Sequence, residues 1–296
     1  MKIIVCVKHI KYIYAQTGTD PKKNFIGPDD IVHLINPLDE SAVEEALRIK
    51  EKHKESEILV MSLGDRWVEE GLRRCLSMGA DKAIHLYVEN GDNLDSWTTA
   101  TIMAHSIRAL DFDLIFCGRE SIDDQCGLVG PYIAEILKIP YVPGIIKFEM
   151  DGVHGKALVH RALEGGNREI MFCKVPALFT VGKGMNLPRY PGLPGILKAE
   201  HQRIETLDVK HLELPVDPFD PASSLTEWVS LSPPKPRRKR KSSEEVKLSA
   251  SDRLKRIVKR SDPKEKEDSK VLEGSSDKVF SEFERVMEEN GIVFVK

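Results

Sequence analysis

Runs of apolar and β-branched residues recur along the first two hundred positions, and the stretches between them have helical periodicity. The apolar runs predict strands at residues 2–7, 57–62, 82–88, 114–117 and 178–181. Runs that are apolar at nearly every position are typical of parallel strands covered on both faces. The pattern therefore predicts a sheet in the interior of the molecule.

Amphipathic helices are predicted between these strands. Asn36 and Pro37, followed by two acidic residues, predict a helix start with a capping side chain and a proline in the first turn. Residues 68–78 form a second helical pattern that Gly79 ends, and residues 98–110 form a third. Because strand and helix alternate, we predict a doubly wound, mostly parallel Rossmann-like α/β sheet.

The pattern changes after Pro140. Shorter strands are predicted at residues 145–150, 156–162 and 169–173, separated by glycine-containing turns, which indicates a small antiparallel addition to the sheet. The stretch 183–195 is rich in glycine and proline, so we expect a loop there and no regular element.

The last third of the chain is polar and interrupted by prolines. We predict an α/β nucleotide-binding domain over residues 1–200 and an extended polar C-terminal arm over residues 201–296. Apolar residues return at helical spacing over residues 277–290, which predicts a terminal helix. Because this helix would follow a solvated tether, it needs a partner to cover its apolar side.

Composition is typical of a globular chain with one substantial core. The 296 residues are 41% hydrophobic and 31% charged, and no apolar run approaches the roughly 20 residues that span a bilayer. We therefore expect a cytoplasmic protein without a transmembrane segment. The five cysteines are an odd count without CxxC spacing, so neither a disulfide framework nor a zinc site is predicted. The sequence also contains no pattern typical of a catalytic triad.

Charge alone identifies no partner. The formal net charge is −3, while residues 235–241 (KPRRKRK) concentrate basic side chains. A nucleic-acid interface would add interleaved aromatic residues or a recognition helix, and the sequence around this run has neither. We therefore expect a solvated tether that contacts a partner subunit, and no nucleic-acid binding.

The stretch 113–140 carries the strongest functional signal. An apolar strand stops at Gly118, a polar loop follows, and Val129 opens an apolar-patterned helix. In α/β proteins nucleotides bind beyond the carboxyl end of a strand, because the free amides and dipole of the next helix attract phosphate. An ordinary βα connection has the same pattern, so the segment alone fits both interpretations equally.

Five motifs occur in order: IIVCVKHI at 3–10, NPLDESAVEEALRIKE at 36–51, LRRCLSMGADKAIHL at 72–86, CGRESIDD at 117–124 and LPRYPGLPGILKA at 187–199. Together they resemble the β subunits of electron transfer flavoproteins, the family that includes the FixA-type proteins. The resemblance covers roughly residues 1–200 and favours the nucleotide-site interpretation. It implies a heterodimer with an α subunit that carries the electron-transferring FAD.

The resemblance also implies a nucleotide pocket in this chain. Its residues would be Cys6, Asn36, Pro37, Leu38, Asp39, Leu63, Gly118, Arg119, Glu120, Ser121, Ile122, Asp123, Asp124, Gln125, Cys126, Gly127, Leu128 and Val129. The two adjacent aspartates would repel a phosphate, so we assign them to ribose hydroxyls or to support of the loop, through backbone capping or Arg119.

The occupant of this pocket stays open between FAD and AMP. AMP-binding members usually have polar side chains where this chain has Gly127, Leu128 and Val129, so phosphate contacts there must come from the backbone. The Val129-Gly130-Pro131 sequence is similar to electron-bifurcating members, which bind a second FAD, although those members carry Thr and Gln at Cys126 and Leu128. We favour FAD.

The resemblance further implies a docking site for flavin dehydrogenases such as acyl-CoA dehydrogenases. Leu193 matches the leucine that anchors family members on these partners, and Lys198 could meet an acidic partner surface. The predicted function is thus an electron-carrier subunit that is not a self-contained enzyme. The alternative is a stand-alone adenine-nucleotide-binding α/β regulatory protein of the adenine-hydrolase type, but the sequence lacks the glycine-rich phosphate loop of those proteins.

Overall fold

The structure is a computed structural model, and it describes residues 1–13, 31–89, 91, 94–151, 155–214, 217, 220, 223–226, 279–281, 283 and 285. The chain divides into two compact units, Met1–Ser232 and Pro233–Lys296. The elements below belong to the first unit.

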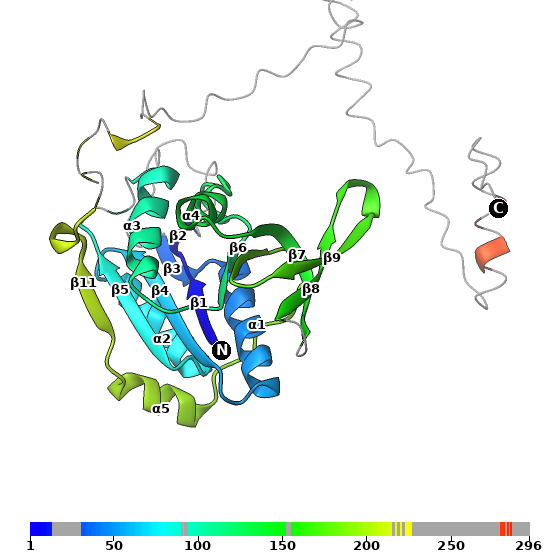
Figure 1. The fold of residues 1–296 in the computed structure, drawn as a ribbon. Coiled ribbons are helices and arrows are strands. Elements are labelled where there is room, and N and C mark those ends of the chain that lie inside the picture. Colours follow the sequence, from blue (N-terminus) through cyan, green and yellow to red (C-terminus); the bar gives the residue numbers. More distant parts are fainter. Residues whose placement is uncertain are drawn as a thin grey trace, which may run out of the picture. The chain divides into compact units, whose positions relative to one another are not determined.

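One large sheet organises the first unit (Figure 1). Its nine strands are β1 (Lys2–Cys6), β4 (Glu57–Gly64), β5 (Lys82–Tyr87), β6 (Leu114–Gly118), β7 (Tyr141–Asp151), β8 (Lys156–Ala162), β9 (Arg168–Lys174), β10 (Ala177–Val181) and β11 (Glu205–Asp208). They lie in the order β11-β5-β4-β1-β6-β10-β7-β8-β9. All pairs from β11 to β7 are parallel, whereas β7, β8 and β9 pair antiparallel. The predicted doubly wound sheet with an antiparallel addition is confirmed.

Helices cover both faces of this sheet (Figure 1). They are α1 (Pro37–Lys52), α2 (Val68–Met78), α3 (Ser96–Arg108), α4 (Val129–Leu137) and α5 (Leu193–His201), with short 3₁₀ turns η3 (Glu164–Gly166) and η4 (Val209–His211). The buried side chains of α1 and α2 join one apolar cluster, and those of α3 and α4 join another. Burial on both faces explains why the central strands are apolar at nearly every position.

The strand order reverses beside β1. From β1 the chain moves to β4 and β5 on one side, and it then returns to β6 and β10 on the other side. Crossover connections on opposite faces leave a crevice at the carboxyl ends of the strands where the order reverses. In this chain that point lies where β1 and β6 end.

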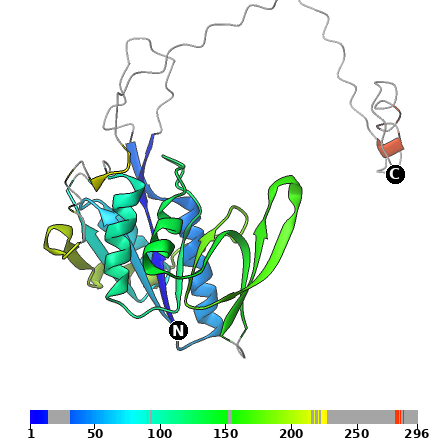
Figure 2. The ribbon, with the colours of Figure 1, turned by 45° about the horizontal axis from the view of Figure 1, so that its top comes forward.

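A two-stranded ribbon, which the sequence reasoning did not predict, separates β1 from α1. It consists of β2 (His9–Ile13) paired antiparallel with β3 (Ile31–Ile35). Figure 2 shows the ribbon extending from the body at the end where β1 finishes. The ribbon returns the chain to the switch point, where α1 begins.

Two expectations about local structure were wrong. Residues 183–195 are not a loop throughout, because Leu193, Pro194 and Gly195 already form the first turn of α5. A proline at the second helical position needs no amide partner, which makes this glycine- and proline-rich start compatible with a helix. Asn36 occupies the N-cap position of α1, but its side chain makes no capping hydrogen bond.

The C-terminal predictions are only partly covered by the described residues. The edge strand β11 pairs with β5, although it lies beyond residue 200, where we predicted that the nucleotide-binding domain ends. The domain boundary itself stays a prediction. Residues 279–281, 283 and 285 are helical, and the rest of the predicted terminal helix and the basic run 235–241 lie outside the described residues. None of the described helices is long and apolar enough to cross a membrane.

Candidate functional site

The segment between β6 and α4, residues 118–129, lies at the switch point of the sheet. We call it the β6–α4 loop. The backbone amide of Arg119 donates to the carbonyl oxygen of Val181 at 3.0 Å, so the loop leaves the sheet beside the end of β10. Side chains that follow β1 and that lie at the start of α1 hold the loop.

Asp39, in the first turn of α1, joins the ends of β1 and β6. Its Oδ1 accepts from the amide of Gly118 at 2.5 Å, and its Oδ2 accepts from the amide of Lys8 at 2.8 Å. The residue is 5% exposed. Burial raises the pKa of Asp39 to about 6, although the hydrogen bonds from both amides oppose this rise.

Asn36 holds the next part of the loop. Its Nδ2 donates to the carbonyl oxygen of Glu120 at 3.0 Å, and its Oδ1 accepts from the amide of Ile122 at 3.3 Å. The side chain thus binds the loop backbone instead of capping α1, which explains the missing helix cap. An amide side chain suits this place because it both donates and accepts.

Lys8, directly after β1, neutralises the two adjacent aspartates. Its Nζ lies 3.0 Å from Asp123 Oδ1 and 2.9 Å from Asp124 Oδ2, and it also donates to Ser121 Oγ at 3.3 Å. In the described residues the cation beside Asp123 and Asp124 is thus Lys8 and not Arg119, while contact of the two aspartates with a ribose stays a prediction. The sequence reasoning missed Lys8, although its place at the end of a buried strand was a usable signal.

Asp124 also shapes the turn of the loop. Its Oδ1 accepts from Ser121 Oγ at 2.6 Å and from the amide of Cys126 at 3.2 Å. Burial opposes ionisation of Asp124, but these hydrogen bonds and Lys8 outweigh it and lower its pKa. Gln125 and Gly127 have φ angles of 54° and 63°, so the turn contains two left-handed residues, separated by Cys126.

Two glycines permit the close packing at this site. A Cβ at Gly118 would lie 2.5 Å from Asp39 Oδ1 and 2.8 Å from Leu38 Cβ. A Cβ at Gly130 would lie 2.7 Å from Thr180 Cγ2. Gly118 is therefore needed for contact with the protein's own α1 turn, and Gly130 lets the start of α4 approach β10.

The start of α4 fits an anionic group. Among the described residues, the backbone amides of Gly127, Leu128, Val129 and Gly130 have no hydrogen-bond acceptor. Free amides at a helix start attract phosphate. Because Lys8 is already paired and neither Leu128 nor Val129 carries a charge, phosphate contacts of this turn would come from the backbone.

The eighteen predicted pocket residues come together in space but differ in exposure. Cys6, Asn36, Asp39 and Ser121 are buried; Leu38, Leu63, Gly118, Gly127 and Val129 are half-buried; Pro37, Arg119, Glu120, Ile122, Asp123, Asp124, Gln125, Cys126 and Leu128 are exposed. The buried residues hold the loop in place, and the exposed residues form its solvent-facing surface. Burial raises the pKa of the Cys6 thiol to about 12, so this cysteine is a packing residue and not a thiolate.

The second predicted site is the segment 183–201, which includes α5 and is named here the α5 segment. Leu193, at the start of α5, is 68% exposed, and Lys198 is exposed further along the helix. Leu187, Tyr190, Ile196 and Leu197 are also exposed. The segment thus presents several large apolar side chains to solvent, which is typical of an interaction site.

An ion-pair cluster anchors the first half of the α5 segment on α1. Arg189 forms a bidentate pair with Glu44, with Nε–Oε2 and Nη2–Oε1 distances of 2.8 and 3.0 Å, and its Nη1 lies 2.6 Å from Glu51 Oε1. The Glu44 side chain is 4% exposed. Burial opposes ionisation of Glu44, but Arg189 and Arg48 outweigh it, so the pKa of Glu44 is lowered.

Contacts with α2 anchor the second half. A Cβ at Gly195 would lie 2.4 Å from the carbonyl oxygen of Ser77, so α5 touches the backbone of α2. Arg73 Nη1 donates to the carbonyl oxygens of Ala199 and Glu200 at 2.6 and 2.9 Å. The guanidinium thereby satisfies the last carbonyls of α5 and complements its dipole.

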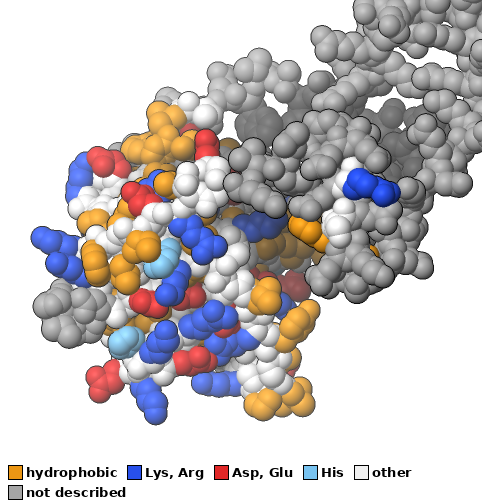
Figure 3. Space-filling view, turned by 90° about the vertical axis from the view of Figure 1, so that its right-hand side faces the viewer, with side chains coloured by type: hydrophobic (Ala, Val, Ile, Leu, Met, Phe, Trp, Pro, Cys, Tyr) orange, Lys and Arg blue, Asp and Glu red, His pale blue; other side chains and the backbone are white. Residues whose placement is uncertain are grey.

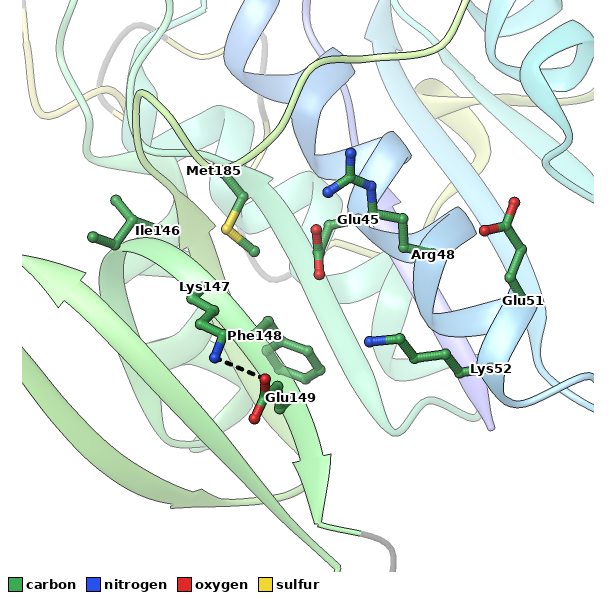
Figure 4. Close-up of a pocket in the computed structure, with 9 residues that line it drawn as sticks. All are labelled: Glu45, Arg48, Glu51, Lys52, Ile146, Lys147, Phe148, Glu149 and Met185. Carbon is green, nitrogen blue, oxygen red and sulfur yellow. Dashed lines mark ion pairs between the residues drawn. The ribbon is translucent and has the colours of Figure 1, made fainter.

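Two surface clefts lie elsewhere on the molecule. One, of about 340 Å³, lies between α1 and β7, where Glu45, Arg48, Glu51 and Lys52 face Lys147, Glu149 and Met185 (Figure 4). The other, of about 460 Å³, lies beside β8 and the start of β9. Neither cleft includes a residue of the β6–α4 loop. Among the described residues, no group of three or more His, Cys, Asp and Glu side chains could hold a metal ion.

Comparison with known proteins identifies the family. The sequence profile described as "Electron transfer flavoprotein domain" matches residues 29–212. "Electron transfer flavoprotein subunit beta" of Thermoanaerobacterium thermosaccharolyticum is 36% identical over 235 residues, covering 79% of this chain and 88% of that protein. The Bacillus subtilis protein of the same description is 37% identical over 197 residues, which are 66% and 75% of the two chains.

A third relative belongs to a named complex. "Caffeyl-CoA reductase-Etf complex subunit CarD" of Acetobacterium woodii is 34% identical over 236 residues, covering 79% of this chain and 88% of that protein. Together with the doubly wound fold, these matches show that the chain belongs to the electron transfer flavoprotein family, with a β-subunit role in electron transfer. The predicted family is confirmed, and the stand-alone regulatory alternative has no support from these relatives.

Proposed function

We propose that this chain is the β subunit of a heterodimeric flavoprotein that carries electrons between flavin dehydrogenases and an acceptor. The chain would supply a nucleotide pocket, a scaffold for an α subunit and a docking segment. Flavins supply the one- and two-electron chemistry when bound, and the protein orients them and tunes their surroundings. The family match and the preformed β6–α4 loop support this proposal.

One observation carries the nucleotide assignment: the β6–α4 loop is held in place by three polar side chains from outside it. Lys8, Asn36 and Asp39 bind the loop, and the amides at the start of α4 are left without acceptors among the described residues. A loop fixed in this way offers its amides to a phosphate without a further ordering cost. An ordinary connection between strand and helix would need no such frame.

We propose FAD or AMP as the occupant, with the adenosine phosphate at the start of α4. Leu128 and Val129 offer apolar contacts and no cationic side chain, so the phosphate would rest on amides. Asp123 and Asp124 are already paired with Lys8, which removes their repulsion of a phosphate. Their free lone pairs could accept from ribose hydroxyls.

Counting nucleotides tests the assignment. The chain would be co-expressed with its α subunit, the complex denatured, and the released FAD and AMP quantified per heterodimer. Two FAD would indicate an electron-bifurcating carrier, and one FAD with one AMP would indicate a simple carrier. Release of a single FAD and no other nucleotide would contradict the pocket.

We propose that the α5 segment docks on flavin dehydrogenases through Leu193, with Lys198 beside it. The anchors on Glu44 and Arg73 hold the segment in one conformation, so an exposed leucine there costs little entropy to bury. Leu193→Ala would raise the apparent KM for the dehydrogenase and leave the nucleotide content unchanged. The cytoplasmic location expected from the sequence stays a prediction.

A further inference from the structure

The outer edge of the sheet exposes an unusual pair of apolar side chains. β9 is the last strand of the nine, and it alternates exposed and covered residues. Ile170 and Phe172 are 61% and 66% exposed, whereas Cys173 packs in the core. A solvent-facing strand surface normally carries polar residues, and edge strands with exposed apolar side chains invite pairing.

Neighbouring strands add to the same face. In the register of the antiparallel addition, Phe172 lies opposite Leu158, and Ile170 lies opposite His160. Paired residues point to the same side of a sheet, so these four side chains form one stripe. Arg168 and Lys174 lie at the two ends of this stripe on β9. We name the surface formed by these six residues the β9 face.

The β9 face continues into a basic cleft. The cleft of about 460 Å³ is lined by Lys147, His160, Arg168 and Lys183, and no carboxylate side chain lines it. Lys147 pairs with Glu149 at 2.8 Å, but within the described part of the chain Arg168 and Lys183 form no ion pair. Figure 3 faces this end of the molecule and shows basic and hydrophobic side chains next to one another, with acidic ones among them.

A second copy of this chain is a poor occupant of the β9 face. Antiparallel pairing of β9 with its own copy, overlapping all seven residues, would place Arg168 opposite Lys174 at both ends. Like charges directly opposite each other are destabilising, and charged residues on edge strands protect against self-pairing. The β9 face has an apolar centre and basic ends. It is therefore complementary to a different protein chain, whose surface carries acidic residues beside apolar ones.

We propose that the β9 face is the docking surface for the second subunit. The matching surface of that subunit carries acidic side chains next to apolar ones. Apolar side chains of that subunit cover Ile170 and Phe172, and a carboxylate enters the cleft between Arg168 and Lys183. The inference rests on the proposed heterodimer. It adds the surface through which the subunits meet and the chemistry of the partner's side.

The test uses the co-expressed heterodimer and compares Phe172→Glu with Leu225→Glu. Leu225 is also 66% exposed but lies beyond β11, where its amide binds Asp95. Phe172→Glu is expected to weaken the heterodimer at least about tenfold in its dissociation constant, and Leu225→Glu to leave it unchanged. Circular dichroism and unfolding of each free chain verify that both variants fold. Equal dissociation constants for the two variants would overturn the proposal.

Charge reversal tests the chemistry of the partner. The double change Arg168→Glu with Lys183→Glu is expected to slow association at low salt at least about tenfold, with Lys138→Glu, at the exposed end of α4, as the control. Unchanged or faster association of the double variant would overturn the acidic-partner inference. A free wild-type chain that is a dimer, and that Phe172→Glu makes monomeric, would assign the surface to a second copy instead.

The same measurements separate this inference from the proposed function. If only the inference is wrong, the heterodimer forms with its nucleotides and Phe172→Glu has no effect. If the proposed function is wrong, the wild-type chain forms no heterodimer with the α subunit, and both proposals fall. If the heterodimer forms and Phe172→Glu weakens it as expected, but the complex contains no second nucleotide, the docking surface is supported and the proposed nucleotide pocket is contradicted.

Discussion

Two buried carboxylates on the same helix, Asp39 and Glu44, hold the two candidate functional segments in different ways. Asp39 accepts from the backbone amide of Gly118, at the start of the β6–α4 loop, and from the backbone amide of Lys8. Glu44 binds the α5 segment through a bidentate ion pair with Arg189. Burial raises the pKa of Asp39 to about 6, whereas charged partners lower the pKa of Glu44 despite its burial.

This difference relates to what each segment presents. The β6–α4 loop, for which we propose a bound nucleotide, is held at its start by neutral amide donors, and the Lys8 cation that also binds it is already paired with Asp123 and Asp124, so it competes little for a phosphate. The α5 segment, for which we propose docking to a protein, has no such constraint and can use the stronger bidentate pair. Helix α1 therefore supports both sites, with one anchor at its first turn and another in its middle.

Loss of the Glu44 anchor should have the largest effect. Glu44→Ala leaves Arg189 without its bidentate partner and should lower the free energy of unfolding by about 3 kcal/mol, at the low end for a buried pair because the Arg189 side chain is 35% exposed. Denaturant unfolding measures this loss, and limited proteolysis should cut residues 183–192 faster. Nucleotide content should not change. Equal loss of nucleotide and of docking would show that the two anchors are not independent.

The pH dependence of stability should reveal Asp39. Its pKa is about 6 in the folded chain against an ordinary value of 3.8, so its contribution to stability is fully present below about pH 3.8 and is lost as pH rises through about 6. The unfolding free energy of wild type minus that of Asp39→Asn should therefore fall by roughly 2 to 3 kcal/mol between pH 4 and 7. Urea titrations of both proteins across this range test it. A difference that rises with pH would mean that the amides outweigh burial.

Closing the space at Gly118 should damage only the nucleotide site. The added Cβ of Gly118→Ala meets Asp39 and Leu38 at 2.5 and 2.8 Å, so the loop must move, at a cost of about 2 kcal/mol. Released nucleotide should fall, and transfer from a dehydrogenase should follow that loss. Gly192→Ala is the control for nucleotide content only, since its Cβ would meet only Pro194 at an ordinary 3.7 Å and it lies in the proposed docking segment. Full nucleotide retention in Gly118→Ala would contradict the close-packing argument.

Removing the charge of Lys8 should have the smallest effect. Its side chain is 43% exposed, so Lys8→Met should cost less than about 1 kcal/mol of stability. Nucleotide affinity should fall a few-fold, because Asp123 and Asp124 would then repel the phosphate, and the loss should shrink at high salt. Lys2→Met, which breaks an exposed pair with Asp111, is the control. An increase in affinity would show that Lys8 does not neutralise these aspartates.

Much of the fold could be predicted because its signals are local. Residues 68–78 form the predicted helix with the predicted ends, and the strands near 57–62 and 156–162 lie where their apolar patterns place them. Burial on one or both faces imposes these periodicities directly on the sequence. The β2–β3 ribbon and β11 were missed, because short edge elements pack on one side only and carry a weak pattern.

The sequence singled out the segments of the candidate site but not the contacts that their side chains make, and nucleotide binding by these residues stays a prediction. Asn36 is of a residue type that often caps helices, yet its side chain binds the backbone of Glu120 and Ile122, which are more than eighty positions away. Lys8 is an ordinary lysine by sequence, and only the fold brings it within 2.9 Å of Asp124. Such contacts are set by the crossing of strands and helices at the switch point, which leaves no local trace in the chain.

The sequence by itself determined the alternation of strands and helices and the family, and it singled out the two segments for which we propose functions. Those features depend on residue type and short-range spacing, which the chain carries in one dimension. The tertiary structure decided which carboxylate meets amides and which meets a guanidinium, and that Ile170 and Phe172 stay exposed at the edge of the sheet. Burial, charge pairing and strand order depend on distances between remote residues, and only the folded chain sets those distances.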